Sequence, residues 1–179
     1  GRLGADVAFA GAVSNDRFGQ LLLAQLAADR VALDLVERCE VPTTLAAAEL
    51  DEHGAAGYRF YVDGTSAPAF EGSLAVSTWL FTGGLALTLE PMARSIEGAI
   101  AAAPVGCAVM IDINARPAAV TDRARYEERL NRVLSRADVV KASDDDLGFV
   151  DAGVAPAEVA RSVLDRGARA VLLTSGGGP

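Results

Sequence analysis

The sequence predicts an α/β protein that combines a mainly parallel sheet with a small antiparallel β element. Short apolar runs alternate with longer segments of helical periodicity, which is the pattern of βαβ units on a parallel sheet. Residues 31–70 interrupt that alternation with two strand-like runs of their own. The chain has 179 residues, of which 51% are hydrophobic and 22% charged, so it is long and apolar enough for one sizeable core.

Five apolar runs rich in Val, Ile and Leu are predicted as buried strands. They span residues 6–13, 77–83, 107–113, 137–142 and 170–175. Four segments with helical periodicity lie among them, at residues 16–30, 90–103, 122–136 and 155–167. In the third helical segment, Tyr126, Leu130 and Val133 are spaced to share one face, which predicts a stripe that packs on the core.

Residues 43–51 and 57–64 are predicted to pair as an antiparallel flap inserted into the α/β body. A polar turn joins them and contains His53, the only histidine of the chain. Tyr58 and Phe60 alternate with more polar neighbours, which gives the second run one apolar face. The alternative is an ordinary hairpin at the edge of a sheet. We therefore expect three segments: the start of the core at 1–30, a β lid at 31–70, and the remainder of the core at 71–179.

Charge and hydropathy argue against two classes of partner. The chain carries 16 basic and 24 acidic residues, a formal net charge of −8. Nucleic-acid affinity rests on clustered Lys and Arg, and the sequence contains no such stripe. No apolar run approaches the ~20 residues that a membrane-spanning helix needs. We therefore expect no nucleic-acid partner, no membrane partner and a cytoplasmic location.

Polar residues follow the predicted strands at four places, and ligands bind beyond the carboxyl ends of parallel strands. The first place runs from Ser14 to Asp16, where Asp16 is suited either to cap the following helix or to face a ligand. The second place is a strand end at which Asp112, Asn114 and Arg116 alternate, so all three are expected on one side. Such a set can bind hydroxyl groups or a phosphate, with a purely structural Asp–Arg pair as the alternative.

The third place follows Lys141, at the end of another predicted strand. Ser143 is placed to cap the next helix, with Asp146 three residues on as its partner in a capping-box arrangement. The two aspartates between them suit a solvated helix start, since acidic residues favour the first turn. The fourth place is the glycine-rich stretch after Thr174, where backbone N–H groups can approach a phosphate. Together the four places predict a site that handles phosphate and a small molecule.

Taken in order, these motifs resemble the ribokinase-like (PfkB) carbohydrate kinase family, closest to its fructokinase-type members. The segments that carry the resemblance are LGADVAFAGAVSNDRFGQLLLAQL, PTTLAAAELDEHGAAGYRFYVDGTSA, DINARP, KASDDDL and LLTSGGGP. In the first segment, Asp16 and Gly19 match the family's Gly-x-Asp-x-x-Gly pattern, whereas Ser14 replaces its glycine. Ser143 and Asp146 stand where the family has Asn and Glu. The resemblance covers essentially the whole chain and implies a three-layer, ribokinase-like α/β fold with a β lid.

The resemblance implies ATP-dependent transfer of the γ-phosphoryl group to the primary hydroxyl of a sugar, with Mg²⁺ as the metal. It makes Arg116 the catalytic candidate within the chain and lets Asp146 act on the metal through a water. The residues implied in nucleotide binding are Lys141, Ser143, Thr174 and Gly176. The residues implied in sugar binding are Asp16, Phe60, Asn114 and Arg116.

The resemblance also bears on the substrate and the partners. Members that take acidic sugars carry arginines where this chain has Val62 and Asp63, which favours a neutral hexose such as fructose. The implied partners are the sugar, ATP and a second copy joined through the lid. The family's N-terminal sugar-binding element would precede Gly1 and its aspartate general base would follow Pro179, so we expect a chain truncated at both ends and inactive by itself.

Two other functions compete with the sugar kinase. The first is a catalytically inactive sugar- or nucleotide-binding α/β domain, which would keep the fold and lack the chemistry. The second is a dinucleotide-dependent oxidoreductase, which is disfavoured because no predicted strand is followed by G-x-G-x-x-G.

Overall fold

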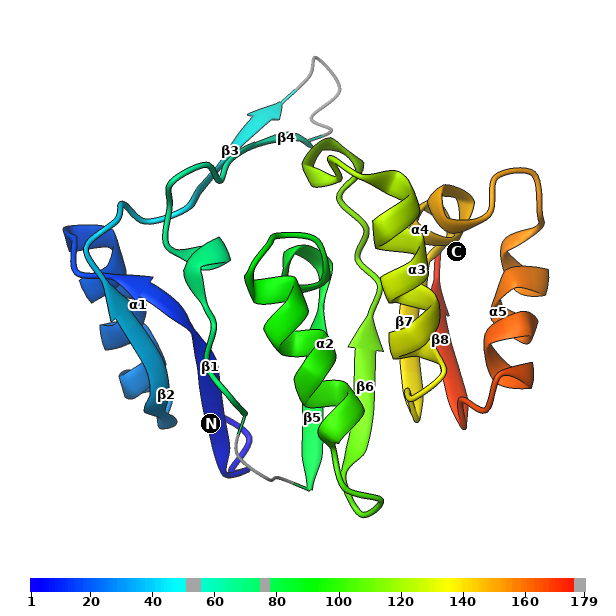
Figure 1. Ribbon diagram of the computed structural model, residues 1–179, viewed down its shortest axis with the longest axis horizontal. Coiled ribbons are helices and arrows are strands. Elements are labelled where there is room, and N and C mark those ends of the chain that lie inside the picture. The colour runs from blue at the N-terminus through cyan, green and yellow to red at the C-terminus, as the bar shows by residue number, and fades with distance from the viewer. Residues whose placement is uncertain (51–55, 75–77, 176–179) are drawn as a thin grey trace. The chain divides into compact units, whose positions relative to one another are not determined.

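A computed structural model of the chain describes residues 1–50, 56–74 and 78–175 (Figure 1). The structure contains two compact units. The first unit comprises residues 1–75 and 90–95, and the second comprises residues 76–89 and 96–179. The predicted turn around His53 and the predicted loop from Gly176 onward lie outside the described residues.

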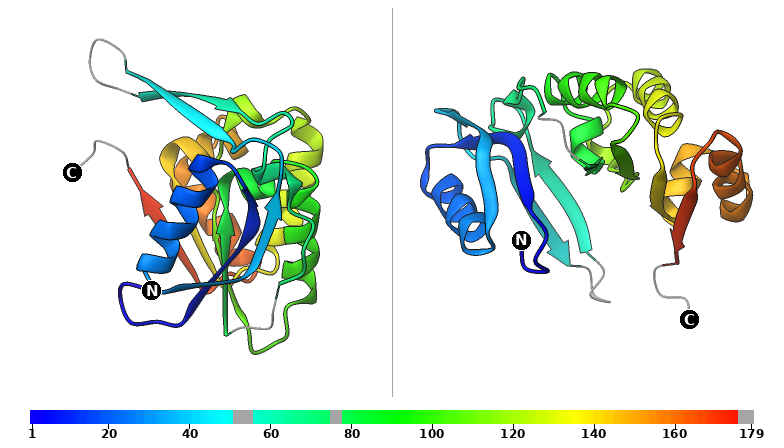
Figure 2. Two further views of the ribbon diagram at one scale, coloured as in Figure 1. Left: turned by 90° about the vertical axis from the view of Figure 1, so that its left-hand side faces the viewer. Right: turned by 90° about the horizontal axis from the view of Figure 1, so that it is seen from below.

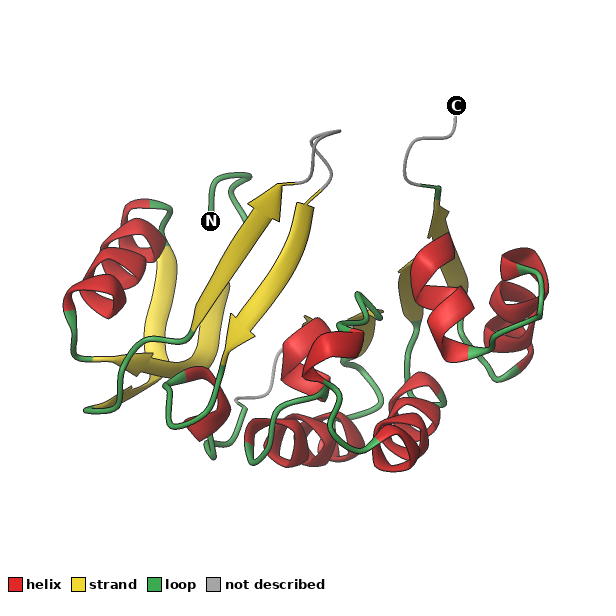
Figure 3. Cartoon of the chain, turned by 90° about the horizontal axis from the view of Figure 1, so that it is seen from above, coloured by secondary structure: helices red, strands yellow, loops and turns green. Residues whose placement is uncertain are grey.

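The first unit is built on a βαβ motif, of which the sequence predicts the first strand and the helix. Strand β1 (Val7–Ser14) leads into helix α1 (Arg17–Ala28), and strand β2 (Val31–Cys39) returns parallel to β1. Figure 3 shows α1 lying along these two strands. The register ends with Ser14 opposite Cys39, so the polar loop after β1 starts level with the end of β2.

Strand β2 is not among the strands expected from the sequence. Its stretch VALDLVERC mixes apolar residues with Asp34, Glu37 and Arg38, because much of the strand is only half-buried. A strand that is covered on one side loses the continuous apolar run that marks a buried strand. The pairing of β2 with β1 favours an inserted hairpin that begins after Cys39, and the segment boundaries at 31 and 70 stay a prediction.

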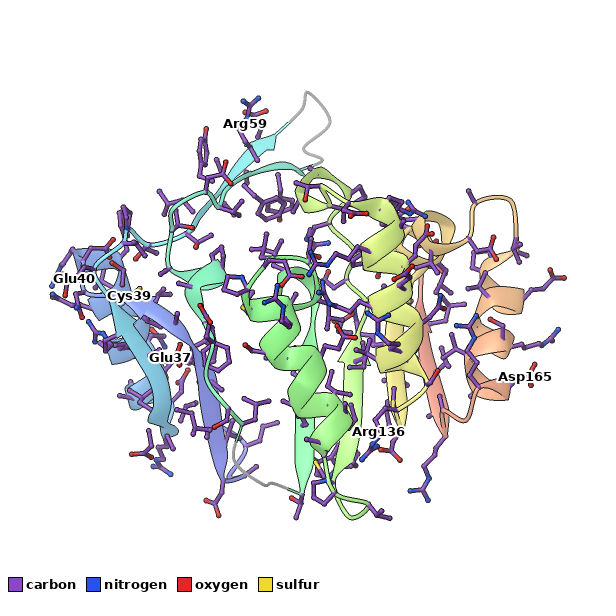
Figure 4. The ribbon with its side chains drawn as sticks, viewed as in Figure 1. Glu37, Cys39, Glu40, Arg59, Arg136 and Asp165 are labelled. Atoms are coloured by element: carbon purple, nitrogen blue, oxygen red, sulfur yellow. The ribbon has the colours of Figure 1, made fainter. Side chains whose placement is uncertain are left out.

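The predicted antiparallel flap is present as strands β3 (Leu45–Leu50) and β4 (Ala56–Tyr61), seen as the cyan arms in Figure 2. Arg59 projects from β4 (Figure 4) and its guanidinium lies 3.6 Å from the Glu49 carboxylate. The base of the hairpin is closed by the hydroxyl groups of Thr44 and Thr65, which lie 2.7 Å apart. A short 3-10 turn η1 (Ala67–Ala69) follows.

The second unit contains a four-stranded parallel sheet in the order β5-β6-β7-β8. Its strands are β5 (Trp79–Gly83), β6 (Ala108–Asp112), β7 (Val139–Ser143) and β8 (Ala170–Thr174). Its helices are α2 (Met92–Ala102, whose first turn belongs to the first unit), α3 (Arg123–Leu134), α4 (Asp144–Val150) and α5 (Pro156–Asp165). Two 3-10 turns, η2 (Gly84–Leu87) and η3 (Pro117–Ala119), follow β5 and β6. The predicted α/β class, with parallel strands and a small antiparallel sheet, is confirmed.

One face of this sheet forms the core of the second unit. Every second side chain of β6 and β7 is buried, including Val109, Ile111 and Val140, and Leu80 is buried in β5. Figure 1 shows α2 and α3 in front of the strands, and the predicted stripe of α3 is buried. Burial of each such side chain stabilises the fold by roughly 1.5–3 kcal/mol. This face of the sheet therefore contributes to the stability of the second unit.

Charged residues fasten the helices and strands of the second unit. Arg129 of α3 is 3% exposed, and its guanidinium donates to Glu97 of α2 at 3.0 Å and to the carbonyl of Leu87 in η2 at 3.2 Å. Arg136, labelled in Figure 4, donates to the carbonyl of Cys107 at 2.9 Å, at the amino end of β6. Arg129 therefore joins α3 to α2 and η2, and Arg136 joins the end of α3 to the start of β6. No helix within the described residues is long and apolar enough to cross a membrane.

Candidate functional site

The polar loop of the first unit follows β1 and is organised by Asp16. One carboxylate oxygen of Asp16 accepts hydrogen bonds from the Gly19 backbone N–H (2.8 Å) and the Thr43 hydroxyl (2.7 Å), and the other accepts from the Thr43 backbone N–H (2.8 Å). These donors, the Gly19 N–H first, hold the pKa of Asp16 well below its ordinary value. The predicted helix cap at Asp16 is confirmed, and its role toward a sugar stays a prediction.

Gly19 allows α1 to start tightly against β1. A Cβ atom at this position would lie 2.0 Å from the carbonyl oxygen of Ser14 and 2.8 Å from its carbonyl carbon. Both are backbone atoms, which cannot rotate away. The close approach places Ser14 under the helix, where its buried hydroxyl accepts from the Asp16 backbone N–H at 3.0 Å. The geometry therefore explains the glycine, whose role the sequence pattern alone leaves open.

The sheet of the second unit brings four of the predicted candidates, Asp112, Lys141, Ser143 and Thr174, to one edge. In the register of the parallel strands, Gly83 lies opposite Asp112, Asp112 opposite Lys141, and Ser143 opposite Thr174. All five residues therefore lie at the carboxyl ends of their strands, the edge at which open α/β sheets bind ligands.

Lys141 and Asp112 form an ion pair at this edge. The Lys141 ammonium lies 3.1 and 3.0 Å from the two carboxylate oxygens of Asp112, and both side chains are partly buried. The alternative offered by the sequence pairs Asp112 with Arg116, whereas the sheet order places Lys141 beside Asp112. A phosphate bound by Lys141 would share the ammonium with Asp112, so the phosphate and the Asp112 carboxylate would compete for the same cation.

The loop after β6 departs from the expected alternation of side chains. Strand β6 ends at Asp112, and Asn114 adopts a left-handed backbone with φ of 38°. The extended backbone that would keep Asp112, Asn114 and Arg116 on one side therefore stops after the first of them. The Arg116 guanidinium turns back and donates to the carbonyl of Ala115 at 2.9 Å.

The pair Gly83-Gly84 completes this loop and was missed in the sequence. A Cβ atom on Gly83 would lie 1.8 Å from the carbonyl oxygen of Asp112, and one on Gly84 would lie 3.3 Å from the side-chain nitrogen of Asn114. Gly84 also has a left-handed backbone, with φ of 55°, and its N–H donates to the carbonyl of Ile113 at 3.3 Å. Two consecutive glycines at the end of a predicted strand could have indicated this close backbone approach and left-handed turn.

The predicted capping box at the start of α4 is confirmed. The Asp146 backbone N–H donates to the Ser143 hydroxyl at 3.1 Å, and the Ser143 backbone N–H donates to one carboxylate oxygen of Asp146 at 2.8 Å. The other carboxylate oxygen accepts from the backbone N–H of Ala115 at 2.7 Å. Asp146 is 6% exposed, so these bonds are shielded from water.

The residues present do not form a ready site for Mg²⁺. No group of three or more His, Cys, Asp or Glu side chains in the described part of the chain could hold a metal ion. Mg²⁺ needs only one or two carboxylates besides phosphate oxygens, yet both oxygens of Asp146 already accept backbone N–H groups and Asp112 faces an ammonium. The role of Asp146 toward a metal therefore stays a prediction from the resemblance.

Thr174, Gly176 and Phe60 are the remaining predicted site residues. Thr174 is exposed at the end of β8, with its hydroxyl 3.5 Å from the carbonyl of Ala142. Gly176 lies outside the described residues. Phe60 is half-buried in the hairpin of the first unit, where its ring stacks on Tyr58 with centroids 6.3 Å apart. Their roles toward nucleotide and sugar stay predictions.

Comparisons with known proteins point to one family. The pfkB family of carbohydrate kinases matches residues 1–178. The fructokinase of Rhizobium leguminosarum bv. trifolii is 28% identical over 181 residues, which is 98% of this chain and 55% of that protein.

Two solved structures are similar in fold and sequence. The fructokinase from Xylella fastidiosa with bound ATP is 25% identical at a TM-score of 0.81, over 99% of this chain and 58% of that one. The fructokinase from Vibrio cholerae O395 in a form with fructose, ADP and calcium ion is 28% identical at a TM-score of 0.84, over 97% and 58%. The chain thus spans little more than half the length of these relatives.

Proposed function

Because this chain belongs to the pfkB family of carbohydrate kinases, we propose that it serves the transfer of the γ-phosphoryl group of ATP to a hydroxyl group of a sugar. Fructose, or a similar neutral hexose, is the proposed acceptor. The curated relative named above is a fructokinase, and the Vibrio cholerae structure holds fructose with ADP. The absence of arginines at Val62 and Asp63 supports a neutral rather than an acidic sugar.

The observation that carries the proposal is the polar edge of the four-stranded sheet. Parallel register gathers Lys141, Ser143 and Thr174 at the carboxyl ends of adjacent strands. Phosphoryl transfer depends chiefly on positioning the phosphates and neutralising their charge. Lys141, Ser143, Thr174 and Gly176 are the proposed nucleotide contacts, and Arg116, whose guanidinium can bind two phosphate oxygens at once, is the proposed catalytic residue.

The proposed sugar contacts are the residues that the family resemblance implies. In the second unit, Asn114 and Arg116 offer an amide and a guanidinium to sugar hydroxyls. In the first unit, Asp16 offers carboxylate oxygens, and the stacked rings of Tyr58 and Phe60 offer an apolar surface of the kind that covers the face of a sugar ring. The nucleotide is proposed to enter with Mg²⁺.

The test is a coupled assay of ATP consumption by the longer protein of which this chain is proposed to be a part, with fructose and a panel of other sugars and nucleosides, in the presence of Mg²⁺. Residues 1–179 alone are proposed to be inactive. We expect turnover that requires fructose, and a loss of roughly 10²–10³-fold in Arg116→Ala, the scale for removing one group that stabilises transferring charge. Arg161→Ala, an exposed arginine on α5, is the matched control and should keep full activity. Absence of turnover with every acceptor would refute the kinase, and calorimetric binding of ATP or sugar without turnover would favour the inactive binding domain.

The hairpin also supports the proposed homodimer. Leu45, Tyr58 and Tyr61 are 46%, 54% and 54% exposed on the two-stranded sheet, and exposed apolar strands favour pairing with another chain. Sedimentation of the protein and of a Tyr58→Ser, Tyr61→Ser double variant tests this. A shift from dimer to monomer in the variant is expected, and a wild-type monomer at all concentrations would refute it. The proposed place of action is the cytoplasm, where ATP is available.

A further inference from the structure

We propose that Asp146 is a positioning residue that holds the Ala115–Arg116 segment in place, and that it acts on phosphoryl transfer through Arg116. The inference rests on the proposed kinase function. Its geometric part, the link from Asp146 to Ala115, belongs to the fold of the second unit and can be tested without any turnover.

The link is a buried charge-assisted hydrogen bond between segments that are distant in sequence. The Asp146 carboxylate accepts from the Ala115 N–H at 2.7 Å across 31 residues of chain. Ala115 is 8% exposed and Asp146 is 6% exposed. A backbone N–H that donates to a buried carboxylate gains about twice the energy of a neutral hydrogen bond, so this bond is a strong tie between the loop after β6 and the start of α4.

Both polar backbone groups of Ala115 are engaged, and the second engagement involves Arg116. The Ala115 N–H donates to Asp146, and the Ala115 carbonyl accepts from the Arg116 guanidinium at 2.9 Å. The residue on the other side, Asn114, has a left-handed backbone, which is uncommon for a residue other than glycine and persists only where the surroundings enforce it. Asp146 supplies that enforcement from α4, and the orientation of the Arg116 side chain follows from it.

The same geometry fixes the orientation of this carboxylate. Each oxygen of Asp146 accepts a backbone N–H, one from Ser143 and one from Ala115. Each oxygen keeps a second acceptor site, so a titration of Mg²⁺ is needed to separate positioning from a role toward a metal. The neighbouring Asp145 is under no such constraint, since it is exposed at the helix surface.

The first experiment measures hydrogen exchange of the Ala115 amide by NMR in residues 1–179. In Asp146→Ala we expect that amide to lose at least ~10-fold in protection, the equivalent of about 1.4 kcal/mol. Asp145→Asn, the matched control, should leave its protection unchanged. Asp146→Asn, which keeps the shape of the side chain, is the second variant should Asp146→Ala fail to fold. Equal protection in wild type and a folded Asp146 variant would overturn the inference.

The second experiment separates positioning from metal binding by titrating Mg²⁺ in the kinase assay. A positioning role predicts that Asp146→Asn lowers kcat ~10-fold or more with an unchanged Mg²⁺ midpoint, and that adding it to Arg116→Ala causes little further loss. A raised Mg²⁺ requirement, or full additivity with Arg116→Ala, would overturn the inference. If the wild type shows no turnover, the proposed function fails, and the exchange experiment alone decides whether Asp146 holds the loop.

Discussion

Replacing Gly19 with alanine should destabilise the first unit because a side chain has no room between α1 and β1. The added Cβ would lie 2.0 Å from the Ser14 carbonyl oxygen, and side-chain carbons essentially never approach closer than 3.0 Å. The helix must therefore move by about 1 Å relative to the strand. Such overpacking costs ~1–3 kcal/mol, and the upper end applies because the obstructing atoms belong to the backbone.

Alanine also favours helix over glycine by ~1 kcal/mol, which offsets part of this cost. The net loss expected for Gly19→Ala is therefore ~2 kcal/mol, or roughly 4–8 °C in melting temperature for a chain of this size. Gly98, in α2, is the matched control, since it is a helical glycine at which an added Cβ would meet no atom within 4 Å. Gly98→Ala should gain up to ~1 kcal/mol and melt higher.

Both variants are compared with the wild type by thermal unfolding in far-UV circular dichroism, with hydrogen exchange of residues 14–28 as the local measurement. The reasoning requires a melting temperature lower than wild type for Gly19→Ala, higher for Gly98→Ala, and faster exchange in α1 only for the former. Wild-type stability in Gly19→Ala would refute the claim that the contact between α1 and β1 demands a glycine.

Three further predictions concern buried or shielded groups. Arg129→Met should lower the free energy of unfolding by ~3 kcal/mol because it removes one partner of a buried ion pair. Arg132→Ala removes a half-exposed arginine and should lower it by less than ~1 kcal/mol. Urea titration of both variants checks these values. Since the pKa of Asp16 lies below its ordinary value of 3.8, its stabilising effect is present above about pH 4 and is lost as the pH falls further; the melting temperature of Asp16→Asn should therefore fall less on acidification than that of the wild type. Burial raises the pKa of Tyr126 to about 12, and its hydroxyl has no hydrogen-bond partner among the described residues. The free energy of unfolding of Tyr126→Phe in urea should therefore match that of the wild type or exceed it by up to ~1 kcal/mol. A clear decrease in that free energy would contradict the prediction.

Local features of the site were predictable from sequence because they depend on short spacings. The capping box at Ser143 and Asp146 follows from a Ser-x-x-Asp spacing before a helix, and the cap at Asp16 follows from an aspartate between a strand and a helix. The strands of the second unit were also predictable, since each contains a short apolar run between segments of helical periodicity. In each case, the residues that decide the structure lie within a few positions of one another.

Contacts between strands were not predictable, because they depend on the order of the sheet. The ion pair of Lys141 with Asp112 exists because β7 lies next to β6. The sequence offered Arg116 as a partner of Asp112 only as the alternative to a ligand-binding set. The bond from Asp146 to Ala115 joins two loops that only the fold brings together. Strand β2 was missed for a different reason, since its half-buried residues include charges that hide the strand pattern.

The second face of the four-stranded sheet gives the protein a built-in optical signal. Trp79, the single tryptophan, is 59% exposed on β5, and Phe81, two residues on, is 67% exposed on the same side. An indole in contact with water emits at longer wavelength and is quenched by acrylamide, and both properties change when another surface covers it. Fluorescence of the unlabelled chain therefore reports directly on the coverage of this face, in the same cuvette in which sugar, nucleotide or a further polypeptide is added.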